Sequence, residues 1–358
     1  MIMTNLYVDI HVLQTVPAAN INRDDTGAPK TALYGGVTRA RVSSQSWKHA
    51  MRHTFITDPA IQAGLRTKSA AELLAKAIKD LAPEQTDESA WEKVQAIFET
   101  AKIKLDKEHQ TGALLLISHG QLEKLAEYAL AHEDYDKKAV KAVLNGDQSL
   151  DLALFGRMVA DNPELNVDAS AQVAHALSTH EIVPEFDYFT AMDDYGHDDN
   201  AGAAMLGSVE FNSATLYRYA NLNIAELVHN VGTPTAVAGA LAYIKSFLLS
   251  MPTGKQNTFA NKTLPSYVLV TLRTDTPVNL VSAFEQPIKS KSGYVAPSVT
   301  ALEKEYQDAQ QFVAAPLATL VLSKLTSHVG TQVADLQTLL AQVEDQLKQV
   351  VPDENTND

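Results

Sequence analysis

The sequence of 358 residues contains no cysteine. This absence excludes disulfides and thiolate metal sites, and it agrees with a reducing compartment. No apolar run approaches the roughly 18 residues that a membrane helix needs, because Lys245 interrupts the candidate at 236–250. The first residues alternate like a strand and have no cationic region, unlike a signal peptide. We therefore predict a soluble, cytoplasmic protein with no membrane partner.

Cofactor and metal motifs are equally scarce. Residues 253–257, TGKQN, resemble the end of a phosphate loop but lack its upstream glycine and the hydroxyl after the lysine. This segment is either a plain loop or a backbone nest whose lysine contacts one phosphate. His175 and His180 are five residues apart, which matches no helical metal motif. We predict no cofactor and no metal.

Basic residues are in the minority: 29 Lys and Arg face 43 Asp and Glu, for a net charge of −14. That total argues at first against a nucleic-acid-binding protein. The charge is uneven, however. Residues 1–55 carry six Lys/Arg and three acids (net +3), whereas residues 181–200 carry seven acids and no Lys or Arg (net −7). A basic face can therefore coexist with acidic surfaces that repel stray nucleic acid or meet basic partners.

The hydrophobic pattern indicates an α+β protein whose apolar content of 45% is enough for a sizeable core. Alternation predicts a strand over 6–13, and 3.6-residue spacing predicts a helical insertion over about 58–179. Further segments are a strand at 210–224, a helix at 233–251, a buried strand at 266–273 and mainly helix after Val299. Without the insertion, the order strand–helix–strand–strand–helix–strand is that of ferredoxin-like and RNA-recognition folds.

The most informative segment is 34–52, YGGVTRARVSSQSWKHAMR. It combines a glycine turn, a basic strand over 37–42, a serine-rich cap and a helix. Trp47, Ala50, Met51, Thr54 and Phe55 fall on one face of that helix, which leaves Lys48, His49, Arg52 and His53 on the others. Unpaired amides at a helix start, serine hydroxyls and nearby cations make a seat for a polyanion. The alternative is a capped surface helix with solvated side chains.

Two other segments carry possible chemistry. Asp24 and Asp25 could hold Mg²⁺ for phosphodiester cleavage, or they could form an Asx-type turn with Arg23 paired to one acid. Phe186, Tyr188, Phe189 and Met158 could insert into a base stack, with ordinary hairpin packing as the alternative. Neither pattern decides between its two interpretations.

Several segments together resemble one family, the backbone subunit of the type I-E CRISPR Cascade complex (CasC-type). They keep the order of the family over roughly residues 1–300. The segments are INRDD at 21–25, LYGG at 33–36, TRARVSSQSWKHAMR at 38–52, FGRM at 155–158, AHALSTHEI at 174–182, DYFTAMDD at 187–194, EFNSATLYRYANLN at 210–223 and GKQNTFAN at 254–261. The match is specific because no single short pattern carries it.

The resemblance implies an RNA-recognition (ferredoxin-like) palm with an inserted helical finger domain and a protruding thumb hairpin. Its expected boundaries are 1–57 for the first part of the palm, 58–179 for the finger, 180–217 for the palm strand and acidic thumb, and 218–358 for the rest of the palm with C-terminal helices. Such subunits stack head to tail along the CRISPR RNA and present its spacer for pairing with target DNA. The implied partners are guide RNA, target DNA through the guide, further copies of the chain and other Cascade subunits.

Carried over by motif, the resemblance also implies RNA-binding residues. The family has Arg where this chain has His49, so that contact is weakened or neutral at pH 7. Phe189 corresponds to a thumb aromatic residue and Met158 to a finger methionine, which in the family displace a base at regular intervals. The full set of expected RNA contacts is Arg23, Arg41, Ser43, Gln45, Ser46, Lys48, His49, Arg52, Met158, Phe189, Thr190, Lys255 and Gln256.

The function expected from the resemblance is a non-catalytic guide-RNA scaffold. Such a protein must grip phosphates without reading bases, because the spacer sequence varies. The alternative is a metal-dependent ribonuclease on a related palm that uses Asp24 and Asp25, since related backbone subunits in other CRISPR types cleave target RNA through a loop aspartate. A third possibility, a helical-repeat interaction protein, is disfavoured by the strands at both ends.

Overall fold

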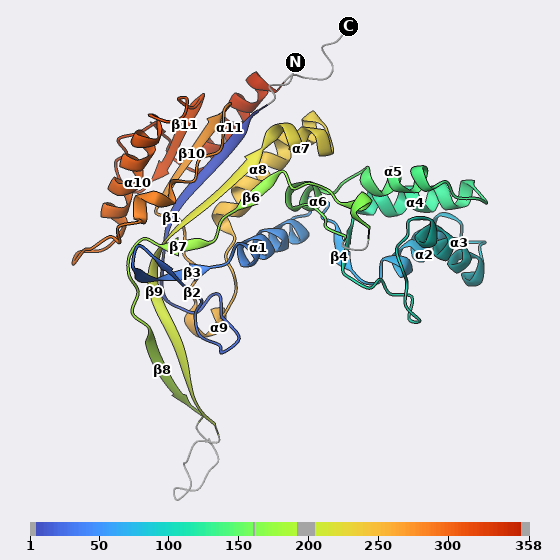
Figure 1. Cartoon of the computed structure of the whole chain (residues 1–358), viewed down its shortest axis with the longest axis horizontal. Helices are drawn as coiled ribbons and strands as arrows, with labels where there is room; N and C mark the ends of the chain where they lie inside the picture. Colours follow the sequence, from blue (N-terminus) through green and yellow to red (C-terminus); the bar gives the residue numbers. More distant parts are fainter. Residues whose placement is uncertain (1–4, 160–161, 192–204, 352–358) are drawn as a thin grey trace, which may run out of the picture.

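The computed structural model describes residues 5–159, 162–191 and 205–351. Its centre is a large, mostly antiparallel sheet (Figure 1). Along the sheet the strands run β12-β11-β10-β1-β9-β7-β3-β2, and β6 and β8 also pair with β9. The strands are β1 (Tyr7–Ala19), β2 (Thr31–Tyr34), β3 (Val37–Val42), β6 (Ala171–Val173), β7 (Ala176–Ser178), β8 (Glu185–Thr190), β9 (Leu206–Asn223), β10 (Tyr267–Arg273), β11 (Ala318–Ser323) and β12 (Thr331–Gln332). The predicted α+β class is confirmed.

Helices cover both faces of the sheet. One face packs against α1 (Ser44–Thr57), α8 (Thr233–Leu249) and α11 (Leu336–Val350) in the largest apolar cluster. The other face packs against η3 (Leu280–Phe284) and α10 (Val295–Ala309) in a second cluster. Strand β1 is consequently buried on both faces along most of its length. The sequence alternation in 6–13 indicated a half-buried strand, and the difference arises because η3 and α10 cover its second face.

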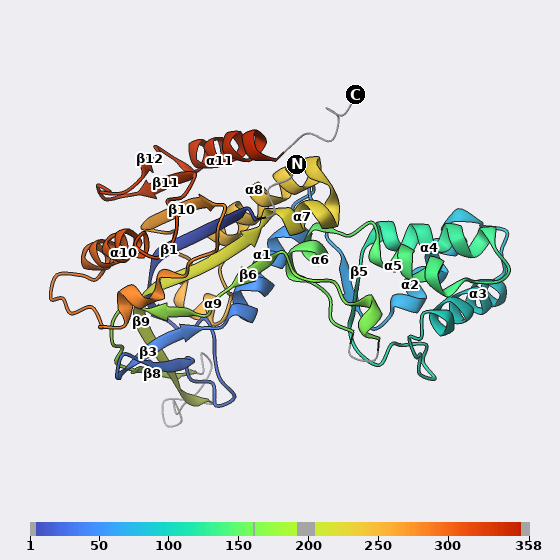
Figure 2. The ribbon, with the colours of Figure 1, turned by 45° about the horizontal axis from the view of Figure 1, so that its top comes forward.

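The predicted helical insertion is present and has its own core (Figures 1 and 2). The buried residues of this core come from between 70 and 165. Its helices and strands are β4 (Leu65–Thr67), α2 (Ala70–Leu81), α3 (Asp87–Thr100), β5 (Leu115–Ile117), α4 (His119–Ala131), α5 (Lys137–Asn145), α6 (Leu150–Phe155) and η1 (Pro163–Leu165). Amphipathic spacing with Ser or Thr before α3 and α4 explains why these segments were recognisable.

The C-terminal part is the main error in the predicted fold. The chain after Val299 was expected to be mainly helical, but β11 and β12 separate α10 from α11. Strand β11 pairs antiparallel with β10 from Tyr267↔Ser323 to Leu272↔Ala318. Its sequence, ATLVLS, is too short to reveal a strand by alternation, and the free edge of β10 decides its conformation.

Two short segments complete the architecture. Helix α7 (Ile224–Val231) connects β9 to α8, and the one-turn α9 (Gln256–Phe259) lies between α8 and β10. Strands β8 and β9 form a hairpin that projects away from the sheet (Figure 1). None of the helices in the described part of the chain is long and apolar enough to cross a membrane.

Candidate nucleic-acid interface

The start of α1 is capped as the serine cluster predicted. Ser43 is the N-cap, and its hydroxyl accepts a hydrogen bond from the Ser46 amide at 3.3 Å. The Ser43 amide donates to Asn22 Oδ1 at 2.8 Å, and the Ser44 amide donates to His175 Nδ1 at 3.0 Å. The amides of Ser43, Ser44 and Ser46 are therefore satisfied inside the protein. An anion at this site must be held mainly by side chains rather than by this row of amides.

One face of α1 presents the polar residues predicted to contact RNA. Gln45, Lys48, His49 and Arg52 are spaced at i, i+3, i+4 and i+7, so they lie along one side of the helix. Gln45 and His49 are exposed and Lys48 is half-buried. Burial lowers the pKa of Lys48, because its charge loses hydration there. No ion pair involves Lys48 in the described residues, so its ammonium is available to a phosphate.

Arg52 has a structural partner that the sequence did not reveal. Its Nε lies 2.7 Å from Asp151 Oδ2, and its Nη2 donates to the Gly64 carbonyl at 2.7 Å. The Asp151 side chain is completely buried. Arg52 thus joins α1 to α6 and to the start of the insertion. These contacts engage two of its three guanidinium nitrogens, so the predicted contact with an RNA phosphate falls to Nη1.

The two arginines of the basic strand β3 differ in burial and in hydrogen-bond partners. Arg39 is buried and donates to the carbonyls of Tyr34, Ser178 and Phe284 at 3.1, 2.8 and 2.8 Å, so it fastens the glycine turn to the sheet. Arg41 is half-buried, and only its Nε is engaged, with the Thr31 carbonyl at 3.0 Å. Arg41 remains a candidate for phosphate contact.

Two basic residues outside the predicted RNA contacts, Lys30 and His175, lie beside Arg41. The Arg41 amide donates to the Lys30 carbonyl at 2.9 Å, and the Ser44 amide donates to His175 Nδ1 at 3.0 Å, so all three residues adjoin the start of α1. Burial first, and then the charges of Arg41 and Lys30, lower the pKa of His175. The spacing of His175 and His180 in the sequence does not predict a metal site. His180 is instead structural: its ring stacks on Tyr294 at 3.6 Å, and its Nε2 accepts from the Thr215 amide at 3.1 Å.

Two loops carrying further predicted contacts lie against each other. A Cβ at Gly254 would overlap the Ile21 carbonyl, so the 253–256 turn packs directly on residues 20–21. This brings Lys255, whose φ of 49° is left-handed, and Gln256 next to the loop that carries Arg23. Arg23 is exposed, and Lys255 and Gln256 are half-buried.

The same loops are tied to the base of the β8–β9 hairpin. Asn20 Nδ2 donates to the carbonyls of Gly27 and Glu210 at 3.0 and 2.9 Å. The rings of Phe211 on β9 and Phe259 on α9 lie 5.5 Å apart. The base of the hairpin therefore lies next to the basic loops.

The two faces of the hairpin differ. Phe189 is paired with Gly207, and a Cβ on that glycine would collide with the Phe189 ring, so the ring lies over the glycine backbone. Phe189 is 39% exposed, on the same face as Phe211 and thus on the side of α9. Phe186 and Tyr188, at 70% and 66% exposure, lie on the opposite face with Thr190. The residues of 181–200 from 192 onward lie outside the described residues.

Met158 is an exposed residue that follows the buried Arg157. Arg157 is buried and donates to the carbonyls of Leu165, Leu116 and Leu144 at 2.8, 3.3 and 2.8 Å. Burial lowers the pKa of this guanidinium to about 10. Met158 itself is 84% exposed. Met158 follows the end of α6 by three residues, and α6 and the β8–β9 hairpin lie on opposite sides of α1 (Figures 1 and 2).

The predicted Asx-type turn is confirmed at Asp24. Its Oδ1 accepts from the Thr26 amide at 2.9 Å, from the Thr26 hydroxyl at 2.7 Å and from the Ala28 amide at 3.1 Å. These hydrogen bonds, with that of the Thr26 side chain foremost, lower the pKa of Asp24. Arg23 forms no ion pair with either acid among the described residues, which corrects that detail. Nor do those residues contain a group of three or more His, Asp or Glu suited to a metal.

Comparison with known proteins places this geometry in a family. Residues 8–351 match the family of CT1975-like proteins (Cas_CT1975). The chain belongs to this family. A chain of a solved "CRISPR RNA-guided surveillance complex, pre-nicking" is 30% identical, with a TM-score of 0.82 over 96% of this chain and 100% of that one.

A second solved structure supports the same assignment. A chain of a "CRISPR RNA-guided surveillance complex" is 26% identical, with a TM-score of 0.72 over 95% of this chain and 99% of that one. The comparison with curated protein sequences gives no match. The resemblance to a Cascade backbone subunit, inferred from the motifs of the sequence, is confirmed at the level of the family.

Proposed function

We propose that this protein is a non-catalytic, CRISPR-RNA-binding backbone subunit. The observation that carries the proposal is the clustering of basic and polar side chains from three segments of the chain. The exposed face of α1 bears Lys48 and His49, the adjoining strand bears Arg41, and the packed loops bear Arg23 and Lys255. Membership of the CT1975-like family supports RNA as the polyanion.

The strand order supports an RNA-recognition-like palm. Taking β6 or β7 as the second strand of the motif, the core strands lie in the order β10-β1-β9-β7, with α1 and α8 on one face. This is the arrangement expected for the strand–helix–strand–strand–helix–strand unit predicted from the sequence. The proposed domains are the palm at 1–57 and 218–358, a finger at 58–179, and the palm strand with its thumb hairpin at 180–217.

The route of the RNA differs from that of a simple RNA-recognition domain, in which bases stack on aromatic residues of the open sheet face. Here that face carries Tyr217 and Tyr219, but η3 and α10 bury both. The guide is therefore proposed to pass along α1 and the loops at the sheet edge. The contacts at this edge are to phosphates, which suits a guide of any sequence.

The exposed side chains of Phe189 and Met158 are proposed to insert into the guide and displace bases. These two residues lie apart within one chain. Each displaced guide base would therefore lie between Phe189 of one copy and Met158 of the next copy. This requires copies to stack head to tail along the RNA, which an open heterologous interface permits. The guide held by the stacked copies would then pair with target DNA inside a cytoplasmic complex that contains other Cascade subunits.

The experiment that tests this function is RNA co-purification followed by binding at several salt concentrations. We expect RNA to co-purify and purified protein to bind unrelated RNA sequences with similar affinity and a steep salt dependence. Affinity that depends on base sequence and not on salt would contradict the scaffold. For the ribonuclease alternative, labelled RNA is incubated with Mg²⁺: cleavage abolished by Asp24→Ala or Asp25→Ala would replace the proposed function.

A further inference from the structure

Three basic side chains from separate segments of the chain meet beside the start of α1. Lys30 precedes β2, Arg41 lies on β3 and His175 precedes β7. The Arg41 amide donates to the Lys30 carbonyl at 2.9 Å, and Arg41 pairs across the sheet with Leu177, two residues after His175. His175 is exposed, and Lys30 and Arg41 are half-buried. The strand pairing therefore places three basic groups side by side at the protein surface.

These three groups have no acidic partner. No ion pair among the described residues involves Lys30, Arg41 or His175. Partial burial first, and then the charges of Arg41 and Lys30, lower the pKa of His175. The charges that act on His175 from the neighbouring segments are thus both positive. A cluster of this kind repels a further proton in the free protein and attracts an anion.

The hydrogen bond of His175 defines the protonation state of its ring. Nδ1 accepts from the Ser44 amide at 3.0 Å, so this nitrogen carries no proton and the neutral ring has its proton on Nε2. A second proton would occupy Nδ1, break this hydrogen bond and make both ring nitrogens donors. The ring would then be a third cation beside Arg41 and Lys30. A negative group bound among the three stabilises that form.

We propose that His175 is a proton-linked contact of the guide, whose protonated ring holds one backbone phosphate together with Arg41 and Lys30. The neutral ring stays on the Ser44 amide in the RNA-free protein, and binding of the phosphate takes up one proton. The backbone bridge between Arg23 and Pro29 joins this cluster to the basic loops, because Lys30 follows Pro29 directly.

This inference rests on the proposed function and adds two contacts and a pH dependence to the same site. The test measures RNA affinity by fluorescence anisotropy at about pH 6 and about pH 8. The probe is a rhodamine-labelled uridine oligonucleotide, because neither phosphodiesters nor uracil changes its charge in this range. The parent protein carries His49→Gln, since His49 is another histidine among the expected RNA contacts.

The parent protein should bind the probe about threefold to tenfold more tightly at the lower pH, because uptake of one proton changes log affinity by at most about one unit per pH unit. The slope of log affinity against log salt should also be steeper at the lower pH, by up to about one unit. Lys30→Gln should weaken binding and lower this slope by about one unit at both pH values.

His175→Asn is the decisive variant. The side-chain oxygen of Asn can accept from the Ser44 amide as Nδ1 does, but the amide group cannot carry a charge. The variant should therefore fold normally, match the affinity of the parent at about pH 8 and lose most of the gain at about pH 6.

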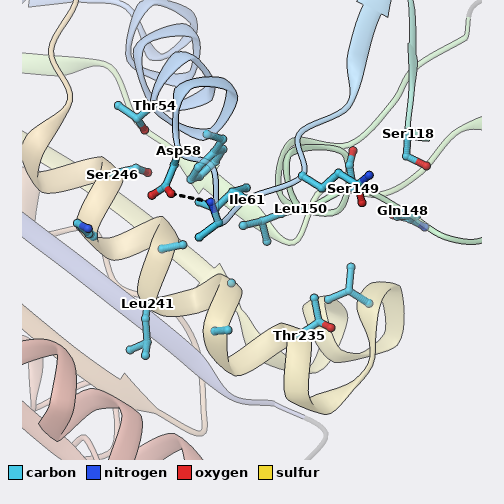
Figure 3. Close-up of a pocket in the computed structure, with 18 of the residues that line it drawn as sticks. Thr54, Asp58, Ile61, Ser118, Gln148, Ser149, Leu150, Thr235, Leu241 and Ser246 are labelled. Carbon is cyan, nitrogen blue, oxygen red and sulfur yellow. Dashed lines mark hydrogen bonds between the residues drawn. The ribbon is translucent and has the colours of Figure 1, made fainter. Parts of the chain in front are cut away.

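The matched control is His119→Asn. His119 is exposed at a cavity of about 860 Å³ whose lining includes Ser118, Thr54 and Asp58 (Figure 3). Thr54 lies ten residues along α1 from Ser44, a distance of about 15 Å on a helix. His119→Asn should therefore keep the pH dependence of the parent.

A gain at low pH that is as large in His175→Asn as in the parent would overturn the inference, as would an equal loss of this gain in His119→Asn. Binding of the parent that is equally tight at both pH values would also overturn it and would leave the proposed function standing. If wild-type protein binds no RNA at either pH, the proposed function itself fails.

Discussion

The guanidinium of Arg52 and the carboxylate of Asp151 form a 2.7 Å ion pair between α1 and α6. The same carboxylate accepts from the Gly64 amide and the Ser149 hydroxyl, each at 2.7 Å. Asp151 is fully buried, so its charge depends on these three partners. Arg52, an RNA contact expected from the resemblance, thus joins the insertion to the core.

Arg52→Ala should therefore act on stability first. Removing one member of a buried pair leaves an uncompensated charge, which typically costs about 3–5 kcal/mol. We expect the free energy of unfolding in urea to fall by roughly that amount. Lys48→Ala, on the same helix and without an ion pair in the described structure, is the control and should leave stability nearly unchanged. Unchanged stability in Arg52→Ala with a weaker salt dependence of RNA binding would restore the phosphate contact.

Lys48 is the better candidate for a phosphate contact on α1. Lys48→Ala should weaken RNA binding equally for all sequences and lower the slope of log affinity against log salt by about one unit. Arg41→Ala, whose guanidinium is engaged only through Nε, should act in the same way. The measurement is fluorescence anisotropy on two unrelated sequences at several salt concentrations. A change of sequence preference at constant slope would show that Lys48 contacts bases.

Short-range sequence patterns were sufficient to predict the helices, because helix conformation depends on residues that are close in the chain. The buried face of α1, with Trp47, Ala50, Met51 and Phe55, follows from 3.6-residue spacing, and the Ser43 cap follows from residue preference. The helical insertion was found for the same reason. Strand β11 was missed because its conformation depends on pairing with β10, a contact that no short window contains.

The candidate site divides in the same way. Sequence motifs predicted RNA contacts at Arg23, Lys48 and Lys255, and the structure shows all three to be exposed or half-buried. The contact at Gly254 brings the loops of Arg23 and Lys255 together. The sequence could not show that the guanidinium groups of Arg39 and Arg52 bind partners inside the protein, because those partners are distant in the chain. It also could not assign a face of the hairpin to Phe189, since the pairing with Gly207 sets that orientation.

The buried face under η3 gives a prediction about pH. Burial raises the pKa of Asp9 to about 7 from 3.8, although its hydrogen bonds from Tyr219 and Val278 oppose the shift. Burial, followed by the charge of Arg273, lowers the pKa of His11 to about 3 from 6.5. Between about pH 4 and 6.5 the folded chain therefore keeps a proton on Asp9 and lacks one on His11, relative to the unfolded chain. Each shift lowers stability, but their contributions to the pH dependence of stability cancel in this window.

Asp9→Asn should uncover the contribution of His11. The unfolded variant then binds one proton more than the folded variant, so stability should rise with pH by about 1.4 kcal/mol per unit between pH 4 and 6.5, relative to wild type. His11→Gln should show the opposite slope, because only Asp9 remains. Urea unfolding at several pH values measures both. Parallel curves for both variants and wild type would show that these groups titrate normally in the folded protein.

The last prediction separates the two faces of the β8–β9 hairpin. Phe189 faces α9 and the basic loops, whereas Phe186 faces away from them. Base–aromatic stacking is worth roughly 1–3 kcal/mol, but insertion also costs a few kcal/mol of lost base–base stacking, so the net effect on affinity is small. Phe189→Ala should therefore change the periodic pattern of base accessibility in chemical probing of the bound guide, with little change in affinity. Met158→Ala should give a milder change, because a flexible thioether is a softer wedge. Phe186→Ala is the matched control and should leave the spacing of accessible bases as in wild type. An unchanged pattern in the Phe189→Ala/Met158→Ala double variant would show that these side chains only pack against protein.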